Sequence, residues 1–175
     1  DFNTWPQTSR AILVVLMFIG ACAGSTGGGI KVSRIIILVK SIKKELTSYI
    51  HPKSISKIHM EGKPVEHEVI RATNVYMITF MVIFVVSTLL LSIEGKDLVT
   101  TFTATIATLN NIGPGLEMVG PTANFGHFNN FSKVILTLNM LIGRLELFPL
   151  LILFHPTLWK DMITQNIRRR RNTSK

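Results

Sequence analysis

The chain has 175 residues, of which 47% are hydrophobic, and its formal net charge is +9. With a mean hydropathy of +0.37, this composition is typical of a membrane protein with basic cytoplasmic ends and excludes a soluble nucleic-acid-binding protein, whose apolar residues do not gather in long spans. The lone Cys22 excludes an internal disulfide and lies in an apolar run, as a small buried residue does. The five histidines show no ligand spacing, so no structural metal site is predicted.

The first apolar segment follows a polar lead-in with Trp5, a residue that favours the membrane interface. A helix is expected from Thr8 or Ser9 to Gly20, about 12 residues or roughly 18 Å, which is too short to cross a bilayer. The chain begins without an initiator methionine, and we interpret it as a piece of a longer polypeptide.

A glycine-rich segment at residues 20–31 interrupts this helix, with five glycines in its first ten residues. Each glycine costs about 1 kcal/mol relative to alanine in a helix. The apolar pattern resumes at Ile30 and continues to about Leu46. The sequence therefore predicts that residues 1–47 form one inner membrane helix broken at mid-depth by a glycine loop, and such breaks are where transporters and channels bind ions or gate.

The glycine segment has two other interpretations. A phosphate-binding loop needs lysine directly after glycine, and here Ile30 separates Gly29 from Lys31. A packing patch of small residues for a neighbouring helix stays open, although three consecutive glycines favour a real break.

The remaining segments are expected to form a hairpin of two membrane helices around a short helix. A residue at the start of the short helix, Asp97 or Thr100, is a candidate cap. An amphipathic helix is expected at 40–50 before the loop. The expected order is a basic cytoplasmic loop at 48–68, an outer helix at 69–93 of roughly 36 Å, a pore helix at 97–109, a filter turn at 110–115, a polar external loop at 116–130, an inner helix at 131–159 and a basic tail at 161–175.

The filter turn contains Asn110, Asn111, Ile112, Gly113 and Pro114. The preceding helix is too short to span, and its C-terminal end carries about half a negative charge, which favours a cation. Non-helical backbone at membrane depth is tolerated only where it lines water or is buried in protein, and its carbonyls can replace a cation's hydration shell. A surface turn is the alternative, but the position between two membrane spans favours a filter.

The orientation follows from the positive charges. Lysines and arginines gather in residues 40–67 and 160–175, whereas residues 94–130 hold only Lys96. By the positive-inside rule, the two basic segments are cytoplasmic and the filter opens outward.

An internal repeat relates residues 9–20 to residues 132–143 at an offset of 123, with six identities and Arg10 opposite Lys133. Arg144 then aligns with the start of the glycine loop. A buried arginine at this depth costs about 2.5–3.5 kcal/mol and needs a partner. We hypothesise that carbonyls of the glycine loop are the hydrogen-bond partners of Arg144. A carboxylate partner is an equally supported alternative.

Three motifs in this order resemble the TrkH-type potassium transporters of the Trk/Ktr/HKT superfamily: GSTGGGIK at 24–31, TLNNIGPG at 108–115, and GRLE at 143–146 followed by FHPTLW at 154–159. The resemblance implies an all-α membrane protein made of membrane helix–pore helix–membrane helix repeats like a potassium channel pore. It places the chain at the last helix of the third repeat plus the complete fourth repeat, so the other three filter strands lie elsewhere.

The resemblance also implies the functional residues. Potassium, the substrate, would bind backbone carbonyls of Asn111, Ile112 and Gly113. The implied gating residues are Gly24, Ser25, Thr26, Gly27, Gly28, Gly29, Lys31 and Arg144.

The implied function is potassium uptake across the bacterial inner membrane by a channel or a symporter, with no covalently bound cofactor and no enzymatic activity. The implied partners are membrane lipid, a second copy in a homodimer, and cytoplasmic nucleotide-binding subunits of the TrkA kind. From the residues alone, a non-conducting membrane scaffold that binds a cytoplasmic partner through its basic loops stays open.

Overall fold

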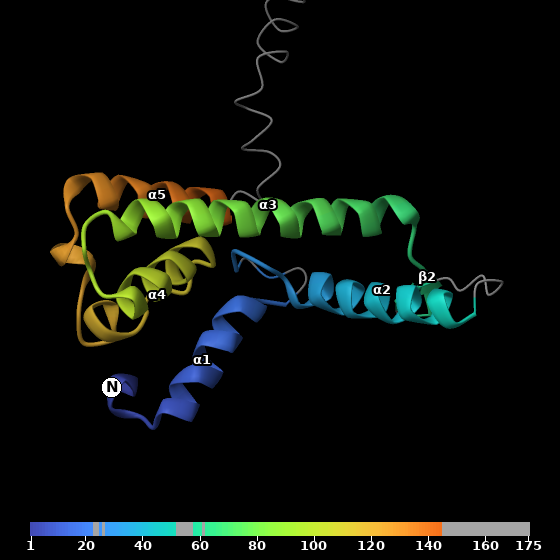
Figure 1. Ribbon diagram of the computed structural model, residues 1–175, viewed down its shortest axis with the longest axis horizontal. Helices are drawn as coiled ribbons and strands as arrows, with labels where there is room; N and C mark the ends of the chain where they lie inside the picture. Colours follow the sequence, from blue (N-terminus) through green and yellow to red (C-terminus); the bar gives the residue numbers. More distant parts are fainter. Residues whose placement is uncertain (23–24, 26, 52–57, 61, 145–175) are drawn as a thin grey trace, which may run out of the picture.

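The computed structural model describes residues 1–144 except 23–24, 26, 52–57 and 61 (Figure 1). The described residues are mostly helical, as expected from the sequence. The elements are η1 (Phe2–Thr4), α1 (Gln7–Ile19), α2 (Val32–Ile50), β1 (His59–Met60), β2 (Lys63–Pro64), α3 (His67–Ser92), α4 (Leu98–Leu109), η2 (Glu117–Val119), η3 (Phe125–His127) and α5 (Asn130–Arg144).

The helix ends lie within a few residues of the expected ones for α1, α3, α4 and the start of α5. The helix α2 is one helix of 19 residues that ends at Ile50, a little past the expected end at residue 47, and it includes most of the segment expected to be amphipathic, 40–50. A two-stranded antiparallel hairpin, β1–β2, was not expected in the loop. The expected continuation of the inner helix to residue 159 and the basic tail at 161–175 lie outside the described residues.

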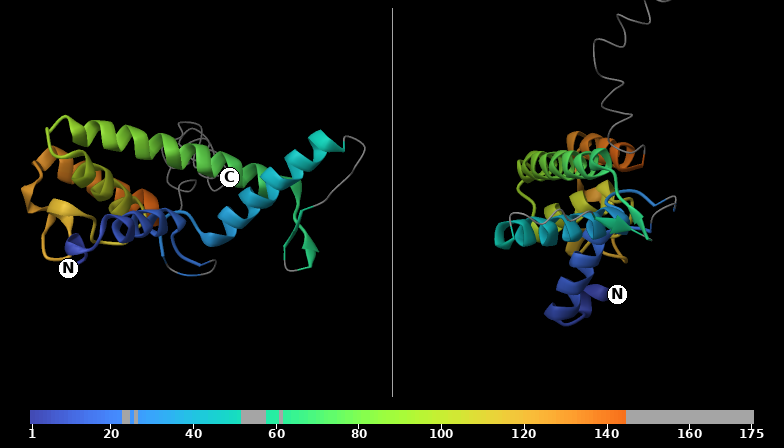
Figure 2. Two further views of the ribbon diagram at one scale, coloured as in Figure 1. Left: turned by 60° about the horizontal axis from the view of Figure 1, so that its bottom comes forward. Right: turned by 90° about the vertical axis from the view of Figure 1, so that its right-hand side faces the viewer.

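The long helix α3 organises the hairpin, and α4 packs against both α3 and α5 (Figures 1 and 2). Within the described part of the chain, α3 alone is long and apolar enough to cross a membrane, while α1 and α4 are shorter apolar helices. The 26 residues of α3 extend about 39 Å, enough for a bilayer core. In both figures α1 and α2 point in different directions on either side of the glycine loop.

An aromatic cluster joins α1 to the hairpin. The ring of Phe84 on α3 lies 5.4 Å from that of Phe18 on α1 and 5.1 Å from that of Phe102 on α4, both edge to face or nearly so. Buried side chains surround this group, among them Phe80 at 1% exposure. Such aromatic contacts contribute about 0.5–1.5 kcal/mol beyond area burial, so α1 is docked on the hairpin by its apolar face.

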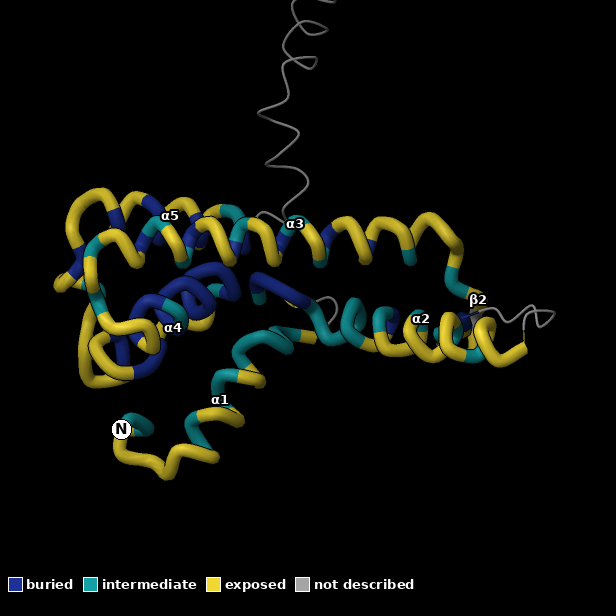
Figure 3. Tube along the Cα trace, in the orientation of Figure 1, coloured by how far each residue is buried: buried dark blue, intermediate teal, exposed yellow. Residues whose placement is uncertain are grey.

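The short helix α4 is buried although it is rich in threonine (Figure 3). The threonine hydroxyls find their hydrogen-bond partners within the helix itself. Thr105 donates to the Thr101 carbonyl at 2.9 Å, and Thr108 donates to the Ala104 carbonyl at 2.8 Å. A hydroxyl satisfied by the carbonyl one turn earlier can be buried without an outside partner. A polar sequence therefore makes a helix that fits between α3 and α5.

Two carboxylates fix the outer ends of the helices. Of the two candidate caps for α4, Asp97 is the one used, accepting from the amide nitrogens of Val99 at 3.0 Å and Thr100 at 3.4 Å. Glu94 accepts from the Ser132 hydroxyl at 2.6 Å and the Asn129 amide at 3.1 Å. The Ser132 hydrogen bond is the main reason that the pKa of Glu94 lies below its ordinary value of 4.5, with smaller contributions from the Asn129 amide and the Lys96 ammonium.

We predict that Glu94→Gln lowers the stability of the purified parent protein near neutral pH by about 1–2 kcal/mol. Because the pKa of Glu94 is lower in the folded protein, the ionised carboxylate stabilises the fold at pH values above the ordinary pKa of 4.5. This stabilisation is lost as the pH falls through the folded-state pKa. The difference in melting temperature between wild type and variant should therefore narrow on acidification. Glu45→Gln, on the exposed surface of α2, is the matched control. A gap that stays constant down to low pH would contradict this assignment.

Candidate functional site

The turn after α4 is exposed in its middle and buried at both ends. Ile112, Gly113 and Pro114 are exposed, whereas Asn110 and Gly115 are buried. The amide of Ile112 donates to the Ala107 carbonyl at 2.9 Å, which bends the chain away from the helix. Gly113 has φ +104, and an added Cβ there would meet no atom within 4 Å. Within this chain, therefore, Gly113 is required by its backbone conformation and not by packing.

The outer end of the turn is tied to α4 and to η2. The amide of Gly115 donates to the Val119 carbonyl at 2.7 Å, and the amide of Leu116 donates to the Thr103 hydroxyl at 3.0 Å. A Cβ on Gly115 would come within 2.7 Å of the Val119 side chain. This close packing fixes where the chain leaves the turn and enters η2.

The inner end is held by the side chain of Asn110, which is 3% exposed. Its amide nitrogen donates to the Met17 carbonyl on α1 at 2.8 Å. Its oxygen accepts from the amide of Ile30 in the glycine loop at 3.3 Å. Asn110 was expected as a filter residue, and in the structure its side chain binds the backbone on both sides of the helix break.

The glycine loop is packed against the base of the turn. The Gly29 amide donates to the Gly143 carbonyl at 3.2 Å, and the Tyr76 hydroxyl donates to the Gly29 carbonyl at 2.9 Å. A Cβ on Gly28 would lie 2.8 Å from the Gly143 carbonyl oxygen, and one on Gly29, at φ +73, would overlap the Asn110 oxygen. These two glycines let one backbone pass against another.

The other expected gating residues divide into three groups. Gly24 and Thr26 lie outside the described residues. Ser25 is exposed, and its hydroxyl donates to the Cys22 carbonyl at 2.9 Å. Gly27 is half-buried, and Lys31 precedes α2 as its cap residue. The structure brings Gly28 and Gly29 to the base of the turn.

The inner helix α5 meets the site at Gly143. A Cβ on Gly143 would overlap the Leu109 carbonyl at the end of α4. Asn111, at φ +54, donates from its side-chain amide to the Met140 carbonyl at 3.1 Å. Arg144 is exposed at the end of the described part of α5, beside the residue that accepts the hydrogen bond from the loop.

Sequence reasoning missed Tyr76 and Gly143 as parts of the site. Tyr76 is 2% exposed, and Arg34 stacks over its ring at 3.9 Å from the centroid. A signal was available, because a buried tyrosine inside an apolar span needs a partner for its hydroxyl. Gly143 is the last residue of the internal repeat, and the repeat alone does not predict which backbone segment packs against it.

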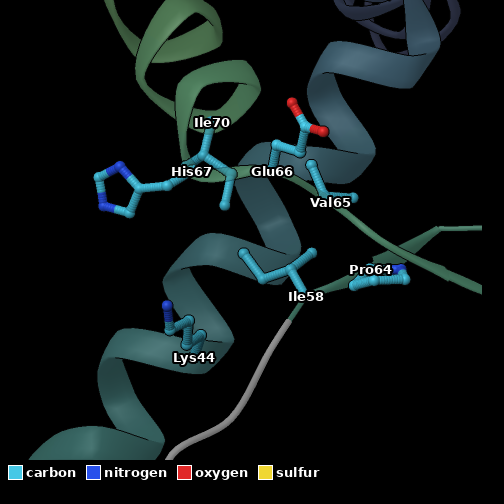
Figure 4. A pocket seen from close by; sticks show the side chains of 7 residues that line it. All are labelled: Lys44, Ile58, Pro64, Val65, Glu66, His67 and Ile70. Carbon is cyan, nitrogen blue, oxygen red and sulfur yellow. The ribbon is translucent and has the colours of Figure 1, made fainter.

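The described residues line one hollow beside the turn and another at the basic loop. One of about 390 Å³ adjoins the turn and is lined by Leu13, Leu16, Met17, Gly20, Ala21, Gly27, Asn110, Asn111 and Ile112. The other, of about 360 Å³, lies where the basic loop meets α2 and α3 (Figure 4) and is lined by Lys44, Ile58, Pro64, Val65, Glu66, His67 and Ile70. Across the described ranges, no group of three or more metal-ligating side chains occurs.

Comparison with known proteins identifies the class and then the family. Residues 1–166 match the model of the family TrkH, described as a cation transport protein. The chain is 41% identical over 157 residues to the Trk system potassium uptake protein TrkH of Escherichia coli K12, covering 90% of this chain and 32% of the relative. It is 42% identical over 160 residues to that of Vibrio parahaemolyticus, covering 91% and 33%.

The solved structure of the potassium transporter TrkH from Vibrio parahaemolyticus superposes with a TM-score of 0.79 at 41% identity, covering 90% of this chain and 33% of that one. The chain belongs to the TrkH family of cation transport proteins. This confirms the expected family, the helical membrane fold and the membrane localisation. The chain spans about a third of the length of the curated relatives it matches.

We predict that Gly29→Ala destabilises the parent protein by at least about 3 kcal/mol, because strain at positive φ adds to the overlap with Asn110. The matched control is Gly95→Ala: Gly95 has φ +74 but open space around it, so it should cost only the conformational part, about 1–2 kcal/mol. Thermal unfolding in detergent measures both. Equal losses in the two variants would show that the loop is not packed against Asn110.

Proposed function

We propose that this chain forms part of the ion-conducting subunit of a Trk-type system for potassium uptake across the bacterial inner membrane. The names of the relatives, potassium uptake proteins, support the substrate. The observation that carries the proposal is the turn at 110–115, whose buried ends are anchored while its middle residues are exposed. A segment held in this way can present carbonyls to an ion without collapsing onto its own chain.

The filter strand would bind potassium through the carbonyls of Asn111, Ile112 and Gly113. The turn begins where α4 ends, so the partial negative charge of the helix C-terminus favours a cation beside it. Positive φ at Asn111 and Gly113 changes the direction of successive peptide units, which lets carbonyls face a common axis. One strand gives only part of a coordination shell, and equivalent turns of other repeats would complete it.

The glycine loop at 20–31 would act as the gate beneath this strand. It lies against the base of the turn through Asn110 and Gly143, so its movement would break contacts at the inner end of the filter. Arg144 adjoins Gly143 and would hold the closed position. Potassium is the cargo in this proposal, and the chain needs no cofactor.

The basic segments at 40–67 and 160–175 would face the cytoplasm and contact membrane lipid and nucleotide-binding regulatory subunits of the TrkA kind. The complete protein would be a homodimer. The regulatory subunits and the homodimer are inferred from membership of the family, and cross-linking in membranes tests both directly.

We predict that Gly113→Asp in the full-length parent abolishes rubidium uptake into vesicles while the protein still folds and inserts. An added Cβ at Gly113 meets no atom within 4 Å, so a scaffold would lose only what the backbone strain costs, whereas a filter would be blocked. Gly95→Asp, at φ +74 and also in open space, controls for the backbone strain and the new charge and should retain uptake. Unchanged uptake in Gly113→Asp would refute the filter and favour the scaffold.

We also predict that Arg144→Ala, or deletion within residues 24–29, raises basal rubidium uptake, because each change weakens the closed gate. Lys133→Ala removes a positive charge from the opposite end of α5, where the side chain is exposed, and should leave basal uptake unaltered. If neither gate variant exceeds wild type at equal protein density, the loop is not a gate.

A further inference from the structure

A second anchor for the turn lies on its outer side, at Glu117. This residue has φ +53, a conformation that is unusual for a residue with a side chain. Asn3 binds both of its backbone groups: the Glu117 amide donates to the Asn3 side-chain oxygen at 3.0 Å, and the Asn3 amide nitrogen donates to the Glu117 carbonyl at 3.2 Å. Backbone strain of this kind costs about 1–3 kcal/mol and persists only where surrounding contacts hold it.

The Glu117 side chain is held as well, by an ion pair with Arg10 on α1. The two side chains are 45% and 19% exposed, respectively, so the pair lies at the rim of the molecule. Gly120 packs against the Asn3 side chain so closely that a Cβ there would overlap it. The contacts join segments more than 100 residues apart in the sequence, across the boundary between the two expected repeats.

Glu117 is coupled to the turn by short links. Glu117 lies two residues after Gly115, and the Gly115 amide donates to the Val119 carbonyl at 2.7 Å. The carbonyl of Glu117 accepts from the Gly120 amide at 3.0 Å. A displacement of Glu117 therefore moves the closed loop that ends the turn. Without the clamp, relaxation of the strained residue would be transmitted to Gly115.

The helix α1 holds the turn at two levels. Met17 accepts the hydrogen bond from Asn110 at the inner end, and Arg10 pairs with Glu117 at the outer end. Seven residues separate these positions on α1, close to two helical turns, so they lie on the same face about 10 Å apart along the axis. One rigid helix thus sets the distance between the two ends of the turn.

We propose that Arg10, Asn3 and Glu117 form an outer clamp through which the preceding repeat positions the filter strand, so that the clamp helps determine which monovalent cation passes. This rests on the proposed potassium transport. Arg10 and Asn3 are positioning residues in this mechanism, acting on the ion only through the backbone of the turn.

Uptake of rubidium and sodium by full-length parent protein in vesicles tests the clamp. Arg10→Gln removes the ion pair, and Glu117→Gly removes it while suiting the positive φ, so the second variant should fold without strain. We expect the rubidium-to-sodium uptake ratio to fall about two- to fivefold in both, the range of a partly exposed ion pair. Arg10→Lys keeps the charge and should restore most of the ratio.

Arg71→Gln is the matched control, because Arg71 is an exposed positive residue on α3 that lies outside the clamp. An unchanged ratio in Arg10→Gln and Glu117→Gly, with normal wild-type uptake, would overturn the clamp and leave the transport proposal standing. The same would follow if Arg71→Gln had an equal effect, since the cause would then be general surface charge.

Hydrogen exchange gives a readout that does not depend on transport. In Arg10→Gln and Asn3→Ala, the amides of residues 115–120 should exchange several-fold faster than in wild type, while those of α4 stay protected. Failure of uptake in wild-type protein would refute the proposed function, and exchange would still decide whether the clamp holds the turn. Unaltered exchange in both variants would overturn the clamp.

Discussion

The side chain of Asn110 is the contact on which the rest of the site depends. It is the only side chain in the described site that binds backbone on both sides of the helix break, through the Met17 carbonyl and the Ile30 amide. The bond with Ile30 is buried and the bond with Met17 is partly buried, and removing one partner of a buried hydrogen bond leaves a group whose desolvation costs about 1–3 kcal/mol. The amide thus fixes the pore helix, the first half of the broken helix and the glycine loop relative to one another.

Close backbone approach explains why glycine recurs around this contact. Gly28, Gly29 and Gly143 each place the chain where a methyl group would strike a neighbouring carbonyl or amide. The gain is a layer in which one segment's backbone donates directly to another's, as the Gly29 amide does to the Gly143 carbonyl. Non-helical backbone in a membrane needs such partners because lipid offers none. The glycines of the loop therefore serve packing between segments as much as freedom of conformation.

The sequence was sufficient for the elements but not for their contacts. Apolar spans and charges located α3, α4 and the helix break to within a few residues, because periodicity and hydropathy are local properties. The helix α2 ends at Ile50, three residues past the expected end at residue 47, because lysines can extend from a helix beyond its apolar stretch. Partners such as Tyr76 with Gly29, 47 residues away, or Glu117 with Asn3, 114 residues away, depend on tertiary packing, which no local pattern encodes.

These contacts imply that the proposed filter strand owes its shape to its surroundings. Its middle residues touch little within the chain: Gly113 has open space around it, and Ile112 is 42% exposed. Its ends are fixed by α4, by Asn110 and by the Glu117 clamp, and α1 contributes to the last two. Discrimination between cations of similar size requires carbonyl positions that do not relax around the wrong ion. In the proposed filter, that stiffness would come from two anchors set a fixed distance apart on α1, at Met17 and Arg10.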